Sequence, residues 1–583
     1  MFHSFADISW LTDMNERKRV CLCLVLVLLA GFIAQSPLAA VMQFHHPDER
    51  YYTDAALLMV ESGDYGTPRF YDGTLRPHKP LLAYWLIAGS FRLFGISMLS
   101  ARLPSLLSGA LLLVLTYRLG WTATRRRETA LLAACLTASQ YTFVLCSNRA
   151  TPDIFLTTAL VLGFLGLFRA LQRGRADACA LAAVFGGAGC AILAKGLLGL
   201  VFLLFAGGCL NQMDGARRPW RLLALVVSLI IVVGGYAFMV SSFDAEFVHG
   251  FLYDQVIGRF VKDNWWHKPL NTLGYLLLTP MLFIAWWPLL ARRETRARLL
   301  ALVRQPRERW VVAAGLWMLA CAVIFGLGNK LTARYVFSAV PLLAVLLAEV
   351  IARPAAAGSD AAVVRRLPRG LKAAATGLLL LGVATVPLTG GLAQTQALPT
   401  AALAGTLALT LAVARLAPPG LAAPAGWSLL SLAGLPLIAL TMHISFNQGI
   451  EQQLPGVIAH LQSQPALRDP VICSIHPAAL SRARLVAGRA LPLVPARDAG
   501  TNAIPAAVRA RLISALDTTT PHSVEFVTVS SVPLPVGSSK EIIQAWRARQ
   551  LPLWRWLPSL LRDGFPVVEF RIEARRNAAG APD

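Results

Sequence analysis

Uncharged apolar stretches recur along most of this chain, and each is long enough to cross a bilayer core, which takes about 20 helical residues. Residues 20–44, 222–243, 270–291 and 310–329 are clear cases, and residues 373–414 are long enough for two. Only 15% of the residues are charged, against about a quarter in soluble domains. The sequence therefore predicts an all-α polytopic membrane protein.

The formal charge of +23 at pH 7 comes from basic clusters that lie in short connections between apolar stretches. This pattern is typical of cytoplasmic loops of membrane proteins, and the chain has none of the common nucleic-acid-binding motifs. We therefore expect membrane lipids, and no nucleic acid, as partners. All the basic clusters fall on the cytoplasmic side if residues 81–93 lie along the periplasmic face and are not counted as a span. This arrangement gives about thirteen spans.

The same charge rule predicts the domain organisation of this multi-pass membrane protein. Residues 1–446 form the transmembrane domain, with periplasmic loops at residues 45–100 and 243–269. Residues 447–583 have a different composition and form a small periplasmic α/β domain. Within it, we expect strands at residues 471–475, 524–529 and 567–572, and a helix at residues 540–550.

Isolated polar residues near the predicted periplasmic ends of the spans are the candidate site, because charge beside a membrane is costly and is usually functional. Cations there would neutralise a phosphate leaving group, and a carboxylate would orient or deprotonate an acceptor hydroxyl. The candidates are Asp48, Glu49, Tyr52, His78, Lys79, Asp153, Lys195, Arg259, His267, Lys330 and Arg334.

Several of these residues also have simpler interpretations. Asp48 and Glu49 are equally typical of surface acids or helix caps, and Asp153 of a helix N-terminus, where an acid is favoured. Lys79 is placed where a lysine reaches the lipid headgroups. Among the histidines, His78 and two in the first loop have no established metal-ligand spacing.

From about residue 48 to residue 347 the chain resembles bacterial membrane glycosyltransferases of the GT-C fold. It is most similar to the family of the lipid A aminoarabinose transferase, which is related to protein O-mannosyltransferases. The motifs are Asp-Glu-x-x-Tyr in the first loop, Lys-Pro before the next helix, Phe-Gly-x-Ser followed by Ala-Arg-Leu-Pro, and Asn-Arg-Ala-Thr-Pro-Asp at a span start. Later matches follow in the same order at residues 195–196, 259–260, 266–269 and 330–331.

The resemblance implies roles for particular residues. Asp48 and Asp153 match the family's essential acids, whereas Lys79 and Arg259 match residues that bind the lipid phosphate, and Lys330 is added as a further phosphate ligand. The donor would be a polyprenyl-phosphate sugar, with undecaprenyl as the lipid. The acceptor would be a lipid A phosphate or, as in the mannosyltransferases, a Ser or Thr hydroxyl.

One departure concerns a metal. The aminoarabinose transferases carry an acidic residue, associated with metal binding, just before the lysine of Lys-Pro, and this chain has His78 there. This departure leaves open whether a divalent metal binds. It also leaves open which sugar is transferred.

These patterns predict an inverting glycosyltransferase that moves a sugar from undecaprenyl phosphate to a periplasmic acceptor, with lipid A or lipopolysaccharide favoured. A protein O-mannosyltransferase-like enzyme is the alternative within the class. A lipid-linked sugar transporter or flippase is the alternative outside it, but that class typically has symmetric halves and broken helices with polar residues at mid-membrane depth.

Overall fold

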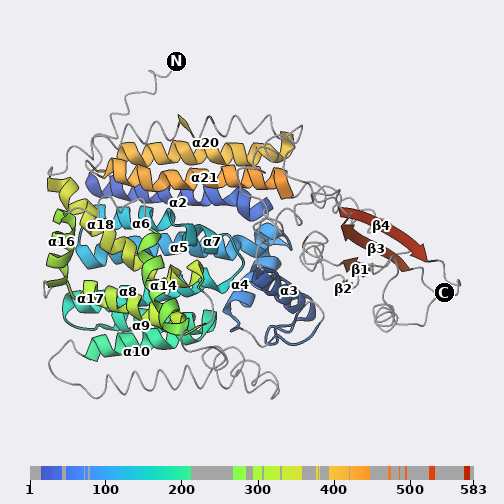
Figure 1. Ribbon diagram of the computed structural model, residues 1–583, viewed down its shortest axis with the longest axis horizontal. Helices are drawn as coiled ribbons and strands as arrows, with labels where there is room; N and C mark the ends of the chain where they lie inside the picture. The colour runs from blue at the N-terminus through green and yellow to red at the C-terminus, as the bar shows by residue number, and fades with distance from the viewer. Residues whose placement is uncertain are drawn as a thin grey trace.

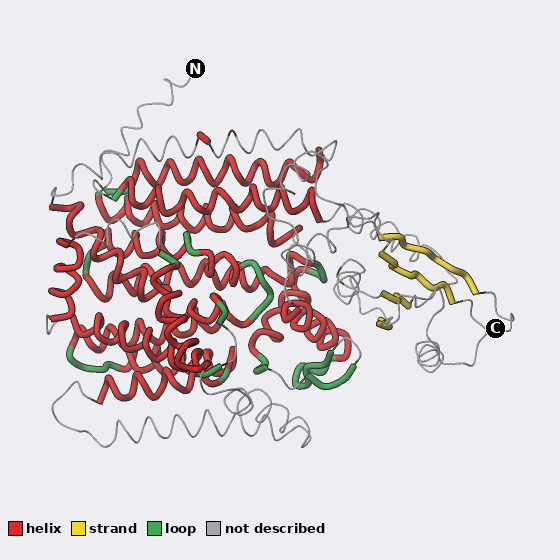
Figure 2. Tube along the Cα trace, in the orientation of Figure 1, coloured by secondary structure: helices red, strands yellow, loops and turns green. Residues whose placement is uncertain are grey.

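The computed structural model shows a mainly helical protein whose long helices run side by side, with a small sheet beyond one end of them (Figures 1 and 2). It describes residues 15–41, 47–70, 73–76, 79–211, 267–283, 293–304, 308–328, 331–357, 376–377, 380, 393–418, 421–446, 471–474, 485, 493–495, 524–531 and 570–577.

Nine helices lie in the described residues before residue 212. They are α2 (Glu16–Val41), α3 (Pro47–Ser62), α4 (Leu82–Phe94), α5 (Met98–Thr124), α6 (Arg127–Ala138), α7 (Tyr141–Ser147), α8 (Pro152–Arg173), α9 (Ala178–Lys195) and α10 (Leu197–Asn211). The later ones are α14 (His267–Met281), α16 (Arg293–Arg304), α17 (Arg309–Gly326), the 3-10 helix η4 (Ala333–Ala339), α18 (Val340–Ala357), α20 (Ala393–Leu416) and α21 (Ala422–Phe446).

Seven helices of the described part are long and apolar enough to cross a membrane, and eight if α6 and α7, bent by 67°, form one span. This confirms the multi-span class. The total of about thirteen spans stays a prediction, because residues 212–266 and other stretches lie outside the described residues. Helix α4 has 13 residues, about 20 Å, and is too short for a core of about 30 Å, in agreement with a position along the membrane face.

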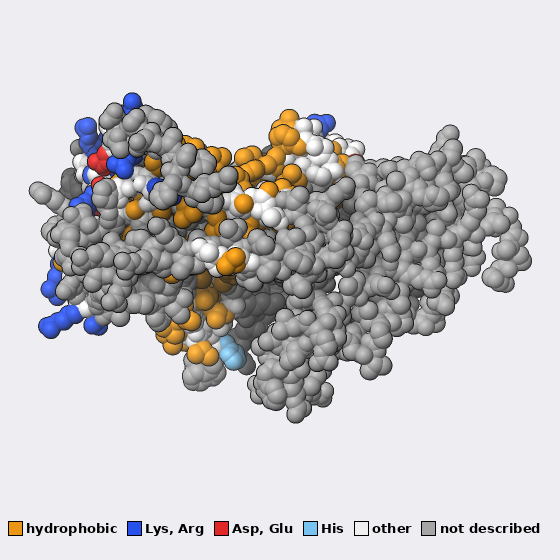
Figure 3. All heavy atoms as spheres, turned by 90° about the horizontal axis from the view of Figure 1, so that it is seen from above, with side chains coloured by type: hydrophobic (Ala, Val, Ile, Leu, Met, Phe, Trp, Pro, Cys, Tyr) orange, Lys and Arg blue, Asp and Glu red, His pale blue; other side chains and the backbone are white. Residues whose placement is uncertain are grey.

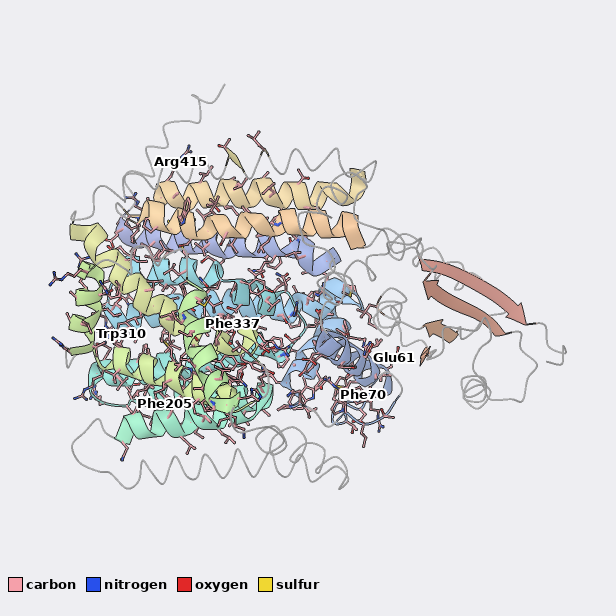
Figure 4. The ribbon with its side chains drawn as sticks, viewed as in Figure 1. Glu61, Phe70, Phe205, Trp310, Phe337 and Arg415 are labelled. Carbon is pink, nitrogen blue, oxygen red and sulfur yellow. The ribbon has the colours of Figure 1, made fainter. Side chains whose placement is uncertain are left out.

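The two ends of the helix bundle differ in charge. Arginines lie at one end, in the last turns of α8, α16 and α20 (Arg173, Arg304 and Arg415) and at the C-cap of α5 (Arg125). Figure 3 shows Lys and Arg side chains gathered at the left end of the described surface, and Figure 4 places Arg415 near that end, with Glu61 at the other. We call this arginine-bearing end the basic end; α3 and α4 lie at the opposite end (Figure 1).

Aromatic rings pack together in the core, and helices α8 and α9 cross closely there. The Trp317 ring of α17 lies 5.4, 5.7 and 5.6 Å from the rings of Phe164, Phe202 and Phe205, which joins α17 to α8 and α10. Where α8 crosses α9, a Cβ added at Gly187 would lie 2.5 Å from the Ala159 carbonyl oxygen. Only a glycine permits that approach, which is typical of membrane helix pairs.

Four short strands form one sheet in the order β2-β1-β3-β4. They are β1 (Val471–Ser474), β2 (Leu493–Pro495), β3 (Val524–Ser531) and β4 (Phe570–Asn577); β1 is parallel to β2 and β3, and β4 is antiparallel to β3. The first two predicted strands are confirmed. The third begins later than predicted in the described residues, at Phe570, and β2 was not predicted because three residues are too few for a period-2 pattern. The predicted helix at 540–550 lies outside the described residues.

Candidate active site

The first loop carries a helix that the sequence did not predict, and this helix orients the two acids. Asp48 and Glu49 occupy the first turn of α3, where the helix dipole favours negative charge. Successive helical residues point about 100° apart, so the two side chains diverge. The Asp48 side chain is 41% exposed, whereas Glu49 is fully buried.

Asp48 is paired with Arg334 of η4. Both terminal nitrogens of Arg334 donate to Asp48 Oδ2 at 3.2 Å, although the two residues are 286 positions apart. The segment before Arg334 is held by α14, because the Thr332 amide donates to the Tyr275 hydroxyl at 3.0 Å and Asn271 donates to the Gly328 carbonyl at 3.0 Å. The segment that leads to Arg334 is therefore anchored to α14 at two points.

Asp153 is paired with Lys195. The acid lies in the first turn of α8, directly after Pro152 at the first helical position, and accepts a hydrogen bond from the lysine. The Asp153 and Lys195 side chains are 5% and 14% exposed. Lys195 ends α9, and Gly196, at φ 78° and ψ −108°, lets the chain turn into α10 at once, because glycine adopts positive φ without strain.

The Tyr335 ring joins these two ion pairs. Lys195 Nζ lies 4.6 Å from its centroid and the Arg334 guanidinium 5.5 Å from it, both within cation–π range. The Phe325 ring stacks on Tyr335 at 4.9 Å. The two acids and their cations therefore form one cluster around an anchored aromatic ring.

Glu49 forms a second, fully enclosed ion pair with Arg102 of α5. Arg102 donates to the two Glu49 oxygens at 2.7 and 3.2 Å and to the carbonyls of Leu38 and Ala39 at 3.3 and 3.0 Å. The Ala150 amide also donates to Glu49 at 3.0 Å. The pair therefore ties the end of α2, α3, α5 and the turn before α8 together.

The sequence predicted Glu49 as a cavity residue, with a surface acid as the simpler interpretation. This contact shows that it is neither. A carboxylate with 1% side-chain exposure and bonds on both oxygens has no face left for a substrate. Glu49 is a positioning residue, since it fixes the helix turn that carries Asp48 and the turn that leads to Asp153.

Arg76 lies in an aromatic cage, and two rings of this cage, Tyr52 and Tyr84, are within electrostatic range of Asp48. Its guanidinium is 5.0, 4.7 and 5.6 Å from the ring centroids of Tyr51, Tyr52 and Tyr84 and donates to the Tyr84 hydroxyl at 2.8 Å. Burial raises the pKa of Tyr84 to about 12 against the opposing effect of Arg76, and burial, with the neighbouring Tyr84, raises that of Tyr52 well above its usual range. Both phenols therefore keep their protons. Tyr52 is a buried residue of the cage around Arg76.

The remaining predicted site residues divide into two groups. Lys79 is half-buried and lies within electrostatic range of Asp153, so it belongs to the cluster. His267 begins α14 with an exposed side chain, and no described contact joins it to the acids. His78, Arg259 and Lys330 lie outside the described residues.

No group of three or more His, Cys, Asp or Glu side chains suited to a metal ion occurs among the described residues. Asp48 and Asp153 are each paired with a cation there. A divalent metal stays a prediction, and His78 lies outside the described residues.

Comparison with known proteins agrees with this arrangement. Residues 78–238 match the family model of dolichyl-phosphate-mannose-protein mannosyltransferase. The undecaprenyl phosphate-alpha-4-amino-4-deoxy-L-arabinose arabinosyl transferase of Pseudomonas aeruginosa (strain UCBPP-PA14) is 28% identical over 355 residues, which are 59% of this chain and 60% of that protein. An uncharacterized protein of Aquifex aeolicus is 25% identical over 344 residues, 57% of this chain and 64% of its own length. The chain thus matches less than two thirds of these relatives.

Among solved structures, the chain is similar to ArnT from Cupriavidus metallidurans bound to undecaprenyl phosphate. The TM-score is 0.61 at 19% identity, with 94% of this chain and 96% of that chain covered. This chain has the GT-C fold, and its sequence is similar to those of these membrane transferases. The resemblance drawn from the motifs is confirmed, and the GT-C fold with it.

Arg102 and Tyr335 help to shape this site, but neither was predicted as a site residue from the sequence. Arg102 carried a signal, because it is a charged residue within an apolar stretch, which by default indicates a functional or structural partner. Tyr335 carried none, since a tyrosine near a span end is ordinary for a membrane protein.

Proposed function

We propose that the chain is an inverting glycosyltransferase that moves a sugar from undecaprenyl phosphate to lipid A or lipopolysaccharide at the periplasmic face of the bacterial inner membrane. The observation that supports this most is the cluster of Asp48 and Asp153 with Arg334, Lys195 and Lys79, at the end of the bundle opposite the basic end. Two acids among cations suit the transfer of a sugar from a phosphate leaving group.

In the proposed reaction, an acceptor oxygen attacks the anomeric carbon of the sugar from the face opposite the donor phosphate. The bond between that carbon and the phosphate oxygen breaks, its electron pair leaves with the phosphate, and the configuration inverts. Lys79 and the residues predicted with it, Arg259 and Lys330, bind the phosphate and neutralise its growing charge.

The two acids have different tasks. Asp48 is the more exposed, so it orients the acceptor and takes its proton where the acceptor is a hydroxyl. An acceptor phosphate needs no deprotonation, and Asp48 then stabilises the positive charge that develops on the sugar. Asp153, which is almost buried, holds Lys195 in place. We assign no step to a metal.

A second candidate, a protein O-mannosyltransferase-like enzyme, is favoured by the family model that matches residues 78–238. The same cluster would serve it, with a Ser or Thr hydroxyl as acceptor and Asp48 as the base. A lipid-linked sugar transporter is less well supported, because the described ion pairs around Asp48 and Asp153 gather at one end of the bundle and a transporter site is expected near its middle.

Mass spectrometry of lipid A from the source bacterium tests the proposal. Four strains are compared: wild type, a deletion, and deletions complemented with Asp48→Asn or with Glu61→Gln. Glu61→Gln is the matched control, since it removes one negative charge from the other end of the same helix. We expect the deletion to lose a sugar-sized mass, Glu61→Gln to restore it, and Asp48→Asn to fail, because a neutral amide neither takes a proton from the acceptor nor stabilises the positive charge that develops on the sugar.

The alternatives give different results. Identical lipid A in all four strains would exclude the lipid A acceptor, and loss of sugar from periplasmic proteins would then support the mannosyltransferase-like enzyme. Full restoration by Asp48→Asn would remove Asp48 from the mechanism. Release of sugar from the donor by purified protein in detergent, where no compartments exist, would exclude a pure transporter.

A further inference from the structure

Arg149 stands out in the turn that connects α7 to α8. Every other residue from Cys146 to Val161 is buried, and Arg149 alone is partly exposed. The turn is held firmly, since the Thr151 amide donates to the Arg149 carbonyl at 2.8 Å and the next residue, Ala150, donates its amide to Glu49. A buried turn fixed by hydrogen bonds therefore carries one partly exposed arginine.

This guanidinium belongs to the acid–cation cluster by position. It lies within electrostatic range of both Glu49 and Arg334, and its turn leads directly into the α8 residue Asp153. Burial lowers the pKa of Arg149, with Glu49 opposing this effect, yet an arginine keeps its charge in proteins. The site therefore holds one more positive charge than the sequence assigned to it.

Arg149 differs from its neighbours in having no acid of its own in the part of the chain that the structure describes. Arg334, Lys195 and Arg102 each form an ion pair, whereas no carboxylate of the described residues lies in ion-pair contact with Arg149. A partly desolvated cation without a counterion is unfavourable, and Arg334 adds like-charge repulsion. This cost is removed if a ligand brings an anion to the turn.

We propose that Arg149 is a phosphate ligand of this site. Arginine is suited to the task because its planar fork matches two phosphate oxygens at once. The proposal rests on the proposed function and deepens it, since it adds a residue to the binding of phosphate. The phosphate is that of the polyprenyl donor or that of a phosphate-bearing acceptor, and a binding experiment distinguishes the two.

The experiment uses the full chain in phosphatidylcholine nanodiscs and measures equilibrium binding of two pairs of probes. Undecaprenyl phosphate is compared with undecaprenol, and lipid A with phosphate-free lipid A. The variants are Arg149→Gln, Arg149→Lys and, as matched control, Arg92→Gln, which removes an exposed arginine from the C-terminal end of α4. Thermal unfolding of each variant reports its folding.

We expect Arg149→Gln to weaken binding of one phosphate-bearing probe roughly tenfold or more, the effect of losing a charge-assisted contact, and to leave its phosphate-free partner unchanged. The affinity of Arg149→Lys for this probe should lie between those of Arg149→Gln and wild type, and it should fall more steeply than the wild-type affinity at high salt. Arg92→Gln should bind as wild type does. Weaker binding of undecaprenyl phosphate means that Arg149 binds the phosphate of the donor. Weaker binding of lipid A means that it binds the phosphate of the acceptor.

Two results would overturn the proposal, and they differ in meaning. If wild type prefers a phosphate-bearing probe but Arg149→Gln and Arg149→Lys bind it equally well, Arg149 is no ligand although the proposed function stands. If wild type prefers neither phosphate-bearing probe, the proposed function fails as well. A loss that Arg92→Gln shares equally would indicate general surface charge and also contradict a role of Arg149.

Discussion

At the scale of the residue, the Glu49–Arg102 pair is the contact on which the site geometry depends most. Both side chains are 1% exposed, and between them they bond to two other segments of the chain, the end of α2 and the turn before α8. Removal of one member of a buried pair leaves the other charge uncompensated, which typically costs about 3–5 kcal/mol.

We therefore expect Glu49→Gln and Arg102→Met each to lower the free energy of unfolding by about 3–5 kcal/mol. The double variant should recover part of that loss, because no buried charge remains. Denaturant unfolding in detergent measures this as a double-mutant cycle. Transfer activity should stay low in the double variant, since Asp48 and Asp153 lose their common support; equal losses that simply add would contradict a direct pair.

At the scale of the element, the crossing of α8 and α9 carries Asp153 on one helix and Lys195 on the other. The crossing is close because Gly187 faces α8: an added Cβ there would meet the Ala159 oxygen and the Gly163 nitrogen, both at 2.5 Å. Gly186, its neighbour, is exposed and has nothing within 4 Å of an added Cβ.

Gly187→Ala should therefore push the two helices apart and lower the unfolding free energy by about 1–3 kcal/mol. Gly186→Ala is the matched control, and its higher helix propensity should raise stability by up to about 1 kcal/mol. Thermal or denaturant unfolding measures both. If both variants changed the unfolding free energy equally, the close approach of α8 and α9 at Gly187 would not limit how these helices pack.

At the scale of the whole molecule, the difference between the two ends of the bundle predicts its orientation. Arginine-rich ends face the cytoplasm in membrane proteins, so the basic end should be cytoplasmic and the acid–cation cluster periplasmic. Ser62, at the end of α3, and Arg175, just after α8, are exposed on opposite ends.

A membrane-impermeant maleimide should label Ser62→Cys in intact spheroplasts and Arg175→Cys only after the membrane is permeabilised. The exposed cysteines of the described residues, Cys21, Cys179 and Cys190, and Cys473 of the predicted periplasmic domain are first replaced by serine, and the parent without an added cysteine is the control. The reverse pattern would place the site on the cytoplasmic side and contradict the periplasmic reaction.

The sequence by itself determined the membrane class, the separation of charge between span ends, and the gathering of Asp48, Lys79, Asp153, Lys195 and Arg334. These properties depend on apolar length and on the order of charges along the chain, which are local. The tertiary structure alone decided which cation pairs with which acid, that Glu49 is buried against Arg102, and that Arg149 has no ion-pair partner among the described residues. Such pairings join residues as far as 286 positions apart, and the packing of helices decides them rather than any pattern along the chain.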